Sequence, residues 1–318
     1  MGGGLDSAAL GTTYMHEHIF VLTPELLQNY PAGWDEEERL ADAITKLREL
    51  KALGVDTIVD PTVVGLGRYI PRVQRIHDQV DLNIVVATGL YTYNDIPFRF
   101  HHYAPDADSG REDPLIQLFA KDITEGIAET GVKAGFLKCA IDEPGLTPGV
   151  ERVMRAVARA HRLTGAPITV HTSVRNEGGK LTQRILREEG VDLSRVVLGH
   201  SGDSTDLDYL RALADAGSIL GMDRFGLDSI LSFDDRVATV AKLCEGGYAD
   251  RLVLSHDANC YIDWFPNDLL ALALPNWNYR HISQDVLPAL RARGVSDAQI
   301  RLMLVDNPRR YFEHGGAY

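Results

Sequence analysis

The segment His16-Glu17-His18 places two imidazoles at positions i and i+2 of the chain. On an extended strand, side chains two residues apart point to the same face, so both rings can reach one point. Two converging neutral imidazoles suit a borderline divalent cation such as zinc, cobalt, manganese or iron. The segment alone also fits a solvated or hydrogen-bonded pair of histidines, so its meaning depends on residues later in the chain.

Four further ligand-type side chains lie near the ends of apolar runs that we interpret as buried strands. They are Lys138, His171, His200 and Asp257. In a barrel of parallel strands the C-terminal strand ends meet at one face, so ligands from distant segments converge there. We therefore predict a site for two divalent metal ions that is formed by His16, His18, Lys138, His171, His200 and Asp257.

Lys138 lies inside the apolar run Gly135-Phe136-Leu137-Lys138-Cys139-Ala140, where an isolated ammonium group is costly. Burial and nearby cations lower the pKa of such a lysine and favour the neutral amine. A neutral amine can react with carbon dioxide to give an anionic carbamate, which can bridge two metals. The alternative is a buried lysine paired with a carboxylate such as Asp257. Because four histidines are expected nearby, we prefer a carboxylated Lys138.

Two metals about 3.5–4 Å apart can share a bridging hydroxide and polarise a carbonyl or phosphoryl oxygen. A water shared by two cations also loses its proton far more readily than bulk water. These residues therefore predict hydrolysis by a metal-bridging hydroxide, without an organic cofactor. In agreement, no Gly-rich dinucleotide fingerprint or P-loop follows a predicted strand, and there is no Gly-x-Ser-x-Gly elbow.

The elements that must position these residues are eight short apolar or β-branched runs. They cover residues 12–20, 55–63, 83–91, 134–141, 166–172, 195–200, 218–223 and 251–256. Several are apolar at consecutive positions, which is typical of strands covered on both faces of a parallel sheet. Helical spacing of apolar residues occurs between them, in residues 36–53, 114–130, 148–163, 205–216 and 234–245.

This alternation predicts an α/β fold, a (β/α)8 TIM barrel with the binuclear metal site at the C-terminal ends of the strands. We expect residues 1–318 to form a single domain, because 318 residues with 45% hydrophobic content are enough for one large core. Residues 269–304 predict two additional helices near the C-terminus, with a turn at Gly294.

The segment 258–277 follows the predicted eighth strand and is rich in aromatic residues and proline. Because loops after barrel strands form the mouth of the active site, we expect this segment to shape the substrate pocket. Cys260 and Trp264 are the predicted substrate-binding residues of an apolar channel. A packed surface loop is the alternative.

Composition excludes several kinds of partner. The formal net charge of −13 argues against nucleic acid, which requires a basic face. No apolar stretch is long enough to cross a membrane, and residues 1–6 lack the basic and apolar regions of a secretory leader. The three cysteines, Cys139, Cys244 and Cys260, are far apart, so no disulfide framework is implied. We expect a cytoplasmic protein with no membrane partner.

At family level, the predicted metal ligands and their surroundings resemble the amidohydrolase superfamily and, more narrowly, the phosphotriesterase-like lactonases. The similarity extends over residues 11–312 and includes Ala87-Thr88-Gly89-Leu90-Tyr91, Asp142-Glu143-Pro144-Gly145, Gly199-His200-Ser201-Gly202-Asp203, Met222-Asp223-Arg224-Phe225-Gly226 and Asn307-Pro308. The resemblance implies that His16, His18 and Asp257 hold an inner metal. It implies that His171 and His200 hold an outer metal, with carboxylated Lys138 as the bridge.

The resemblance also implies the substrates: lactones, especially N-acyl homoserine lactones used in bacterial signalling (quorum quenching), with promiscuous hydrolysis of organophosphate triesters such as paraoxon. Tyr91 and Arg224 match catalytic and substrate-binding residues of the family. Asp203 and Asp257 are candidates for proton handling. A packing or salt-bridge role is the alternative for Tyr91 and Arg224.

Two stretches differ from the expected pattern or have no assigned role. Residues 174–179 are more polar and charged than expected, which would alter the outer rim of the site. Residues 99–102 form an aromatic and basic cluster. We expect a homodimer, as is common among relatives, with Tyr69, Ile70 and residues 98–103 as a candidate contact patch.

Two other functions remain open. One is a dedicated phosphotriesterase or another ester hydrolase of the same superfamily. The other is a metal-binding interaction module without catalysis. The predicted pocket residues argue against the module, because storage of a metal needs no shaped pocket.

Overall fold

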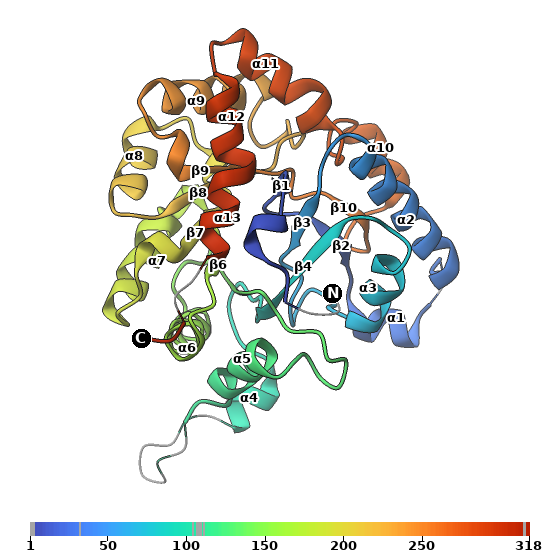
Figure 1. Ribbon diagram of the computed structural model, residues 1–318. Coiled ribbons are helices and arrows are strands. Elements are labelled where there is room, and N and C mark those ends of the chain that lie inside the picture. Colours follow the sequence, from blue (N-terminus) through green and yellow to red (C-terminus); the bar gives the residue numbers. More distant parts are fainter. Residues whose placement is uncertain (1–3, 32, 104, 106–109, 111, 314–315) are drawn as a thin grey trace.

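The computed structural model describes residues 4–31, 33–103, 105, 110, 112–313 and 316–318. Eight parallel strands form one sheet in the order β1-β3-β4-β5-β6-β7-β8-β9 (Figure 1). Directly after edge strand β1, the N–H of Met15 donates to the carbonyl oxygen of Leu254, the last residue of the other edge strand β9, at 3.3 Å, which brings the edges together. The predicted (β/α)8 barrel is confirmed.

Each predicted strand run contains a strand of the structure. The bounds are β1 (Thr13–Tyr14), β2 (His18–Val21), β3 (Thr57–Asp60), β4 (Asn83–Gly89), β5 (Phe136–Ile141), β6 (Ile168–Thr172), β7 (Val196–Gly199), β8 (Ile219–Met222), β9 (Leu252–Leu254) and β10 (Asn259–Ile262). The first run differs from the prediction, because the chain leaves β1 at Met15 and resumes at His18. β2 then pairs in parallel with β10, outside the barrel sheet.

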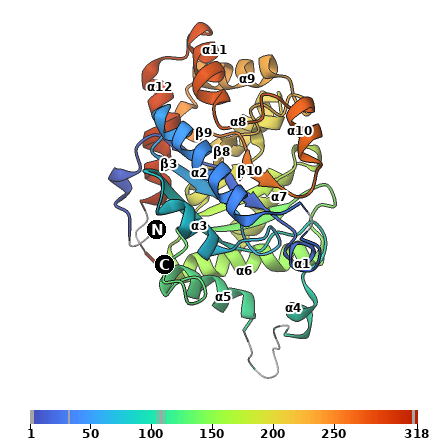
Figure 2. The ribbon, with the colours of Figure 1, turned by 90° about the vertical axis from the view of Figure 1, so that its right-hand side faces the viewer.

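Helices cover the outside of the sheet, as Figure 1 shows, and Figure 2 shows α2 and α3 lying side by side in front of the strands. Their bounds are α1 (Pro24–Asn29), α2 (Glu36–Ala52), α3 (Ile70–His77), α4 (Phe98–His102), α5 (Pro114–Thr124), α6 (Pro148–Thr164), α7 (Gly178–Glu188), α8 (Leu207–Asp215), α9 (Phe233–Glu245), α10 (Asn267–Ala273), α11 (Leu287–Ala292), α12 (Asp297–Arg301) and α13 (Asn307–Phe312). None of the described helices is long and apolar enough to cross a membrane.

Local sequence signals explain where the best-predicted helices begin and end. Pro148 opens α6, where its missing N–H costs nothing, and the Thr147 hydroxyl accepts from the N–H of Val150 at 3.3 Å. Gly165 ends the helix with a positive φ of 73°, a conformation that glycine adopts without strain. Asp35 caps α2 by accepting from the first-turn N–H groups of Glu37 and Glu38.

Other helices differ from the prediction for identifiable reasons. The helix predicted over residues 114–130 ends at Thr124, because the chain turns at Gly126, whose φ is 136°. α7 was not predicted, since it begins at Gly178 and Gly179. The C-terminal region has three helical stretches instead of two, because Pro275 follows α10. The predicted turn at Gly294 is present, with a φ of 87°.

The last helical stretch closes the bottom of the barrel. α12, the π-helical turn Leu302–Asp306 and α13 follow one another without a break, and the stretch contacts β1 and β9. Tyr311 of α13 is fully buried, and its hydroxyl lies 2.8 Å from the Thr169 hydroxyl of β6. The opposite, C-terminal ends of the strands are therefore the open side of the barrel.

Strand periodicity decides which side chains face the barrel interior. Phe136 belongs to the small inner cluster of buried apolar residues, whereas Leu137 packs with the larger cluster under the helices. Lys138 is two residues beyond Phe136 and shares its inward face.

On the outer side, Ile70 is buried in the larger cluster at the start of α3, so the prediction that it joins a contact patch with Tyr69 is wrong. We expect residues 1–6 to lack the features of a secretory leader, and residues 1–3 of this segment lie outside the described residues.

Candidate metal centre

The structure brings all six predicted ligands together at the open end of the barrel. His16 lies in the bend between β1 and β2, and His18 opens β2. Lys138 and His171 lie on β5 and β6. His200 comes directly after β7, and Asp257 lies in the segment between β9 and β10. The four histidines and the lysine are buried, and the Asp257 side chain is 15% exposed.

Asp257 lies at the centre of the cluster. Its Oδ1 atom is 3.4 Å from Nε2 of His16 and also 3.4 Å from Nε2 of His18. Its Oδ2 atom is 3.8 Å from Nδ1 of His200. His16, His200 and Asp257 each offer one ligand atom, and these atoms lie within 4.8 Å of one another. Nζ of Lys138 is 3.4 Å from Nε2 of His16, so the lysine adjoins the same centre.

A second group of carboxylates and a hydroxyl orients the imidazole rings from behind. Asp223 Oδ1 lies 2.8 Å from His200 Nδ1, and Asp223 Oδ2 lies 3.4 Å from His16 Nδ1. The Thr62 hydroxyl is 2.7 Å from Nδ1 of His18. His18 and His200 therefore each have Nδ1 hydrogen-bonded to an outer group and Nε2 facing another predicted ligand, the arrangement by which proteins fix the tautomer of a metal-ligating histidine. Nδ1 of His16 faces Asp223 without a hydrogen bond.

His171 follows the same rule with its two nitrogens exchanged. Its Nε2 is 2.6 Å from Asp142 Oδ2, and its Nδ1 is 2.8 Å from Nε2 of His200. The sequence included Asp142 and Asp223 in family-like motifs but gave them no role, and Thr62 was missed. The available signal was position, since Asp142 and Asp223 each come directly after a strand.

Burial favours the neutral forms of His171, His200 and Lys138. It lowers the pKa of His171 to about 4, of Lys138 to about 8, and of His200 well below its ordinary value. Burial opposes ionisation of Asp223, but the neighbouring His200 and His16 hold its pKa below the ordinary value of a carboxyl group. Imidazole nitrogens and carboxylates are ligands that suit divalent cations such as zinc, and the lowered pKa of Lys138 makes its neutral amine more accessible.

The backbone of the site is strained at three strand ends. Five described non-glycine residues have positive φ, and three of them are His200, Arg224 and Asp257, at 62°, 62° and 55°. Such a conformation costs about 1–3 kcal/mol and persists only where the surroundings enforce it. The surrounding structure therefore holds these three side chains in position at a cost in local stability.

Glu17, a fully buried residue that the sequence analysis left without a role, holds the neighbours of Asp257. Its Oε1 accepts from the N–H of His256 at 2.8 Å, and its Oε2 accepts from the N–H of Ala258 at 3.0 Å. Oε1 also lies 2.7 Å from His256 Nδ1. Because Glu17 stands between His16 and His18, it ties the first two predicted ligands to the segment that carries Asp257.

Five of the six predicted ligands line the floor of a cavity of about 510 Å³: His16, His18, Lys138, His171 and Asp257. Tyr91 and Arg224 line this cavity close to the predicted ligands. The wall further out is apolar and contains Leu227, Ile230, Ile262, Trp264, Phe265 and Trp277. A polar floor beneath an apolar wall suits a ligand with a reactive polar head and an apolar tail.

The predicted substrate and catalytic residues fall into two groups. Tyr91, Arg224 and Trp264 line the cavity, and the Tyr91 hydroxyl lies 3.4 Å from His171 Nδ1. Asp203 does not line it, because it lies behind Arg224, accepting from Nη1 at 2.8 Å. Cys260 does not line it either. Its side chain is buried, with Sγ 3.4 Å from the Tyr279 hydroxyl, and does not contribute to the cavity wall.

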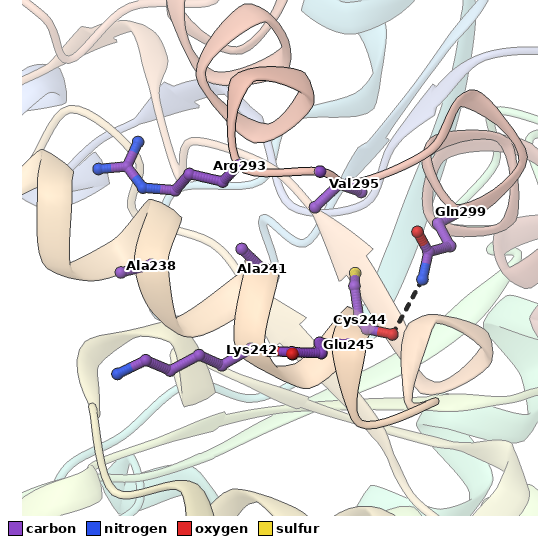
Figure 3. Close-up of a pocket in the computed structure, with 9 residues that line it drawn as sticks. Ala238, Ala241, Lys242, Cys244, Glu245, Arg293, Val295 and Gln299 are labelled. Atoms are coloured by element: carbon purple, nitrogen blue, oxygen red, sulfur yellow. Dashed lines mark hydrogen bonds between the residues drawn. The ribbon is translucent and has the colours of Figure 1, made fainter.

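A second cavity of about 520 Å³ lies on the outside of the barrel, between α9 and the turn that joins α11 to α12 (Figure 3). Cys244 and Gln299 line it, and the Gln299 amide donates to the Cys244 carbonyl oxygen at 2.9 Å. Its lining contains no histidine and no group of converging ligand-type side chains. The candidate active site is therefore the cavity at the strand ends.

A barrel of eight parallel strands with a buried His/Lys/Asp cluster at their C-terminal ends defines a metal-dependent hydrolase of the (β/α)8 class. The family model for the phosphotriesterase family matches residues 1–312, and the chain belongs to this family. The family depends on a binuclear metal centre, and the chain is a hydrolase acting on ester bonds. The predicted family and enzyme class are confirmed.

Three known proteins illustrate the relationship. A "Phosphotriesterase homology protein" of Mycobacterium tuberculosis is 61% identical over 99% of this chain and 97% of its own length, and the structure of the phosphotriesterase from that organism superposes with a TM-score of 0.97. An "Aryldialkylphosphatase" of Saccharolobus solfataricus is 40% identical over 97% of this chain and 96% of its own. A structure described as "Molecular Engineering of Organophosphate Hydrolysis Activity from a Weak Promiscuous Lactonase Template" is 33% identical over 98% of both chains, with a TM-score of 0.88.

Proposed function

We propose that the protein is a lactonase that hydrolyses N-acyl homoserine lactones, and so quenches quorum signals, together with other lactones. Hydrolysis of organophosphate triesters is a promiscuous second activity of the same site. The observation that carries this proposal is the cavity itself, with its predicted ligands at the floor and its apolar wall of Leu227, Ile230 and Trp264. The aryldialkylphosphatase and lactonase-template relatives support both halves of the proposal.

The inner ion would be held by His16, His18 and Asp257, and the outer ion by His171 and His200. Lys138, as its carbamate, would lie between them. The residues fit such a pair of divalent ions (zinc, cobalt, manganese or iron), because each imidazole turns one nitrogen to the centre while its other nitrogen faces an outer group. When bound, the ions would activate a water and stabilise negative charge on an ester oxygen.

The protein's own side chains orient the substrate and accept a proton. Arg224 donates from Nε to Asp257 Oδ2 at 3.2 Å and from Nη1 to Asp203 at 2.8 Å, which holds the guanidinium against the cavity. We propose that Arg224 and the Tyr91 hydroxyl bind substrate oxygens. Asp257 accepts the proton released by the attacking water. Asp203 acts by holding Arg224, since it is also ion-paired with Arg236 at 2.7 Å.

The apolar wall would bind the acyl chain of the substrate. Trp264 is 43% exposed and Phe265 is 49% exposed, so both present apolar surface that a chain can cover. Each methylene removed from water contributes up to about 0.8 kcal/mol, or about a fourfold gain in kcat/KM. We therefore expect kcat/KM to rise with acyl length until the wall is fully covered.

The decisive experiment measures kcat/KM for a series of acyl homoserine lactones and for paraoxon on one metal-loaded preparation. We expect higher values for the lactones and an increase with acyl length. A higher value for paraoxon than for every lactone would support the dedicated phosphotriesterase. Two bound metals without hydrolysis of any lactone or ester would support the metal-binding module.

We further propose that the protein is a homodimer. Tyr69, Phe98 and Tyr103 are exposed by 53%, 83% and 52%, which is unusual for aromatic side chains and supports a self-contact there. We also propose a cytoplasmic location. It is supported by three cysteines that are buried and free, as expected in a reducing compartment.

A further inference from the structure

Asp142 is fixed at the C-terminal end of β5, four residues beyond Lys138, with both carboxylate oxygens engaged. Oδ2 lies 2.6 Å from Nε2 of His171, and Oδ1 accepts from the N–H of Glu143 at 2.6 Å. The Asp142 side chain is 19% exposed and contacts His171, which lines the cavity. A carboxylate held in this way presents a fixed acceptor to one nitrogen of one imidazole.

This contact decides which nitrogen of His171 is free. With its proton on Nε2 and donated to Asp142, the neutral ring has an unprotonated Nδ1. The opposite assignment applies to His200, whose Nδ1 lies 2.8 Å from Asp223 Oδ1 and whose Nε2 is then unprotonated. These two unprotonated nitrogens are 2.8 Å apart and face each other. Two lone pairs at this distance repel unless a cation shares them.

Asn176, in the polar segment 174–179, holds the backbone of Asp142 in place. Asn176 donates from Nδ2 to the backbone carbonyl oxygen of Asp142 at 2.7 Å. Arg175 donates from Nη1 to the Glu143 carboxylate at 2.7 Å. The N–H of Gly145 donates to the same Asp142 carbonyl oxygen at 2.7 Å and closes the turn after β5. The segment that departs from the expected family pattern thus links the loop after β6 to the loop after β5.

We propose that Asp142 is a positioning residue for the outer metal ion, acting through His171, and that Asn176 sets the position of Asp142. Asp142 fixes the tautomer and orientation of His171 so that Nδ1 faces the outer metal position. This inference rests on the proposed function, in which two metals bind. Glu143, one residue away, contacts Arg175 and not His171, so its side chain has no part in this role.

The experiment titrates metal-free wild-type, Asp142→Ala, Asp142→Asn and Glu143→Gln proteins with cobalt in bicarbonate-containing buffer and measures both dissociation constants by calorimetry. We expect one of the two sites to weaken roughly 10–100-fold in Asp142→Ala. Asp142→Asn should show a smaller loss, because its amide oxygen still accepts from Nε2–H. Glu143→Gln, the matched control, should bind both ions as the wild type does.

A second readout does not depend on metal. In the metal-free protein, the ¹⁵N shifts of His171 should show a proton on Nε2 in the wild type and a mixture of tautomers in Asp142→Ala. This inference alone would be overturned if the wild type binds two ions and both Asp142 variants keep the wild-type metal affinities and the wild-type tautomer of His171. Wild-type binding of fewer than two ions would contradict the proposed function, and the tautomer measurement would still decide the role of Asp142.

Discussion

Replacing Glu17 with glutamine should destabilise the protein even though it removes a buried negative charge. Glu17 is fully buried, and its two oxygens accept from the N–H groups of His256 and Ala258 and from the His256 ring. The ring must donate from Nδ1, because its Nε2 accepts from the N–H of Ile282 at 2.8 Å. Glutamine keeps one acceptor oxygen and places an amide donor where the other oxygen accepted.

The size of the effect follows from this mismatch. If the glutamine oxygen stays with His256, the N–H of Ala258 and the new amide face each other as two buried donors. A buried donor without a partner costs about 1–3 kcal/mol. Burial raises the pKa of Glu17 well above its ordinary value, so loss of the charge offsets part of this cost. We expect a net decrease of about 1–3 kcal/mol in the free energy of unfolding.

The assay is urea unfolding of the metal-free proteins followed by circular dichroism, because bound metal would add its own stabilisation. Glu143→Gln is the matched control, since it removes an exposed carboxylate and should change the free energy by less than about 0.5 kcal/mol. A Glu17→Gln protein as stable as this control would refute the reasoning, since Glu17 would then not hold the segment around Asp257.

Three further predictions concern the bridge, the pocket and the oligomer. Lys138→Arg should lose metal and activity, because a guanidinium forms no carbamate; full activity would exclude the bridge, whereas partial rescue of Lys138→Ala by short carboxylic acids would support it. Trp264→Ala should change the dependence of kcat/KM on acyl length more than it changes metal content, and a profile of unchanged shape would reduce Trp264 to a packing role. Light scattering should give the mass of a dimer, and a monomer mass at all concentrations would contradict the proposed self-contact.

The sequence predicted the main ligands because their positions follow from strand periodicity and barrel closure. His171, for example, lies at the end of an apolar run, and the parallel sheet brings it to the face where His16 also lies. The outer groups were not predicted, because their partners depend on side-chain direction across long separations. Glu17 and His256 are 239 positions apart, and nothing local in either segment indicates the pair.

The differences in the fold have similar causes. The run 12–20 is apolar enough for one strand, yet β2 leaves the barrel because it pairs with β10. Gly178 and Gly179 concealed the start of α7, which packs tightly there: a Cβ on Gly179 would lie 2.8 Å from Leu213. The aromatic residues that follow β9 in the sequence predicted the wall of the pocket, and Trp264 and Phe265 do line it. Nothing in the sequence indicated that the Cys260 side chain faces Tyr279 instead.

Lactone hydrolysis by this chain should require two bound metal ions. The most direct measurement adds cobalt stepwise to the metal-free protein and records hydrolysis of an N-acyl homoserine lactone at each ratio. We predict little activity in the metal-free protein and a plateau at two equivalents per chain. Full activity without metal, or two bound equivalents with no lactone hydrolysis, would contradict this prediction.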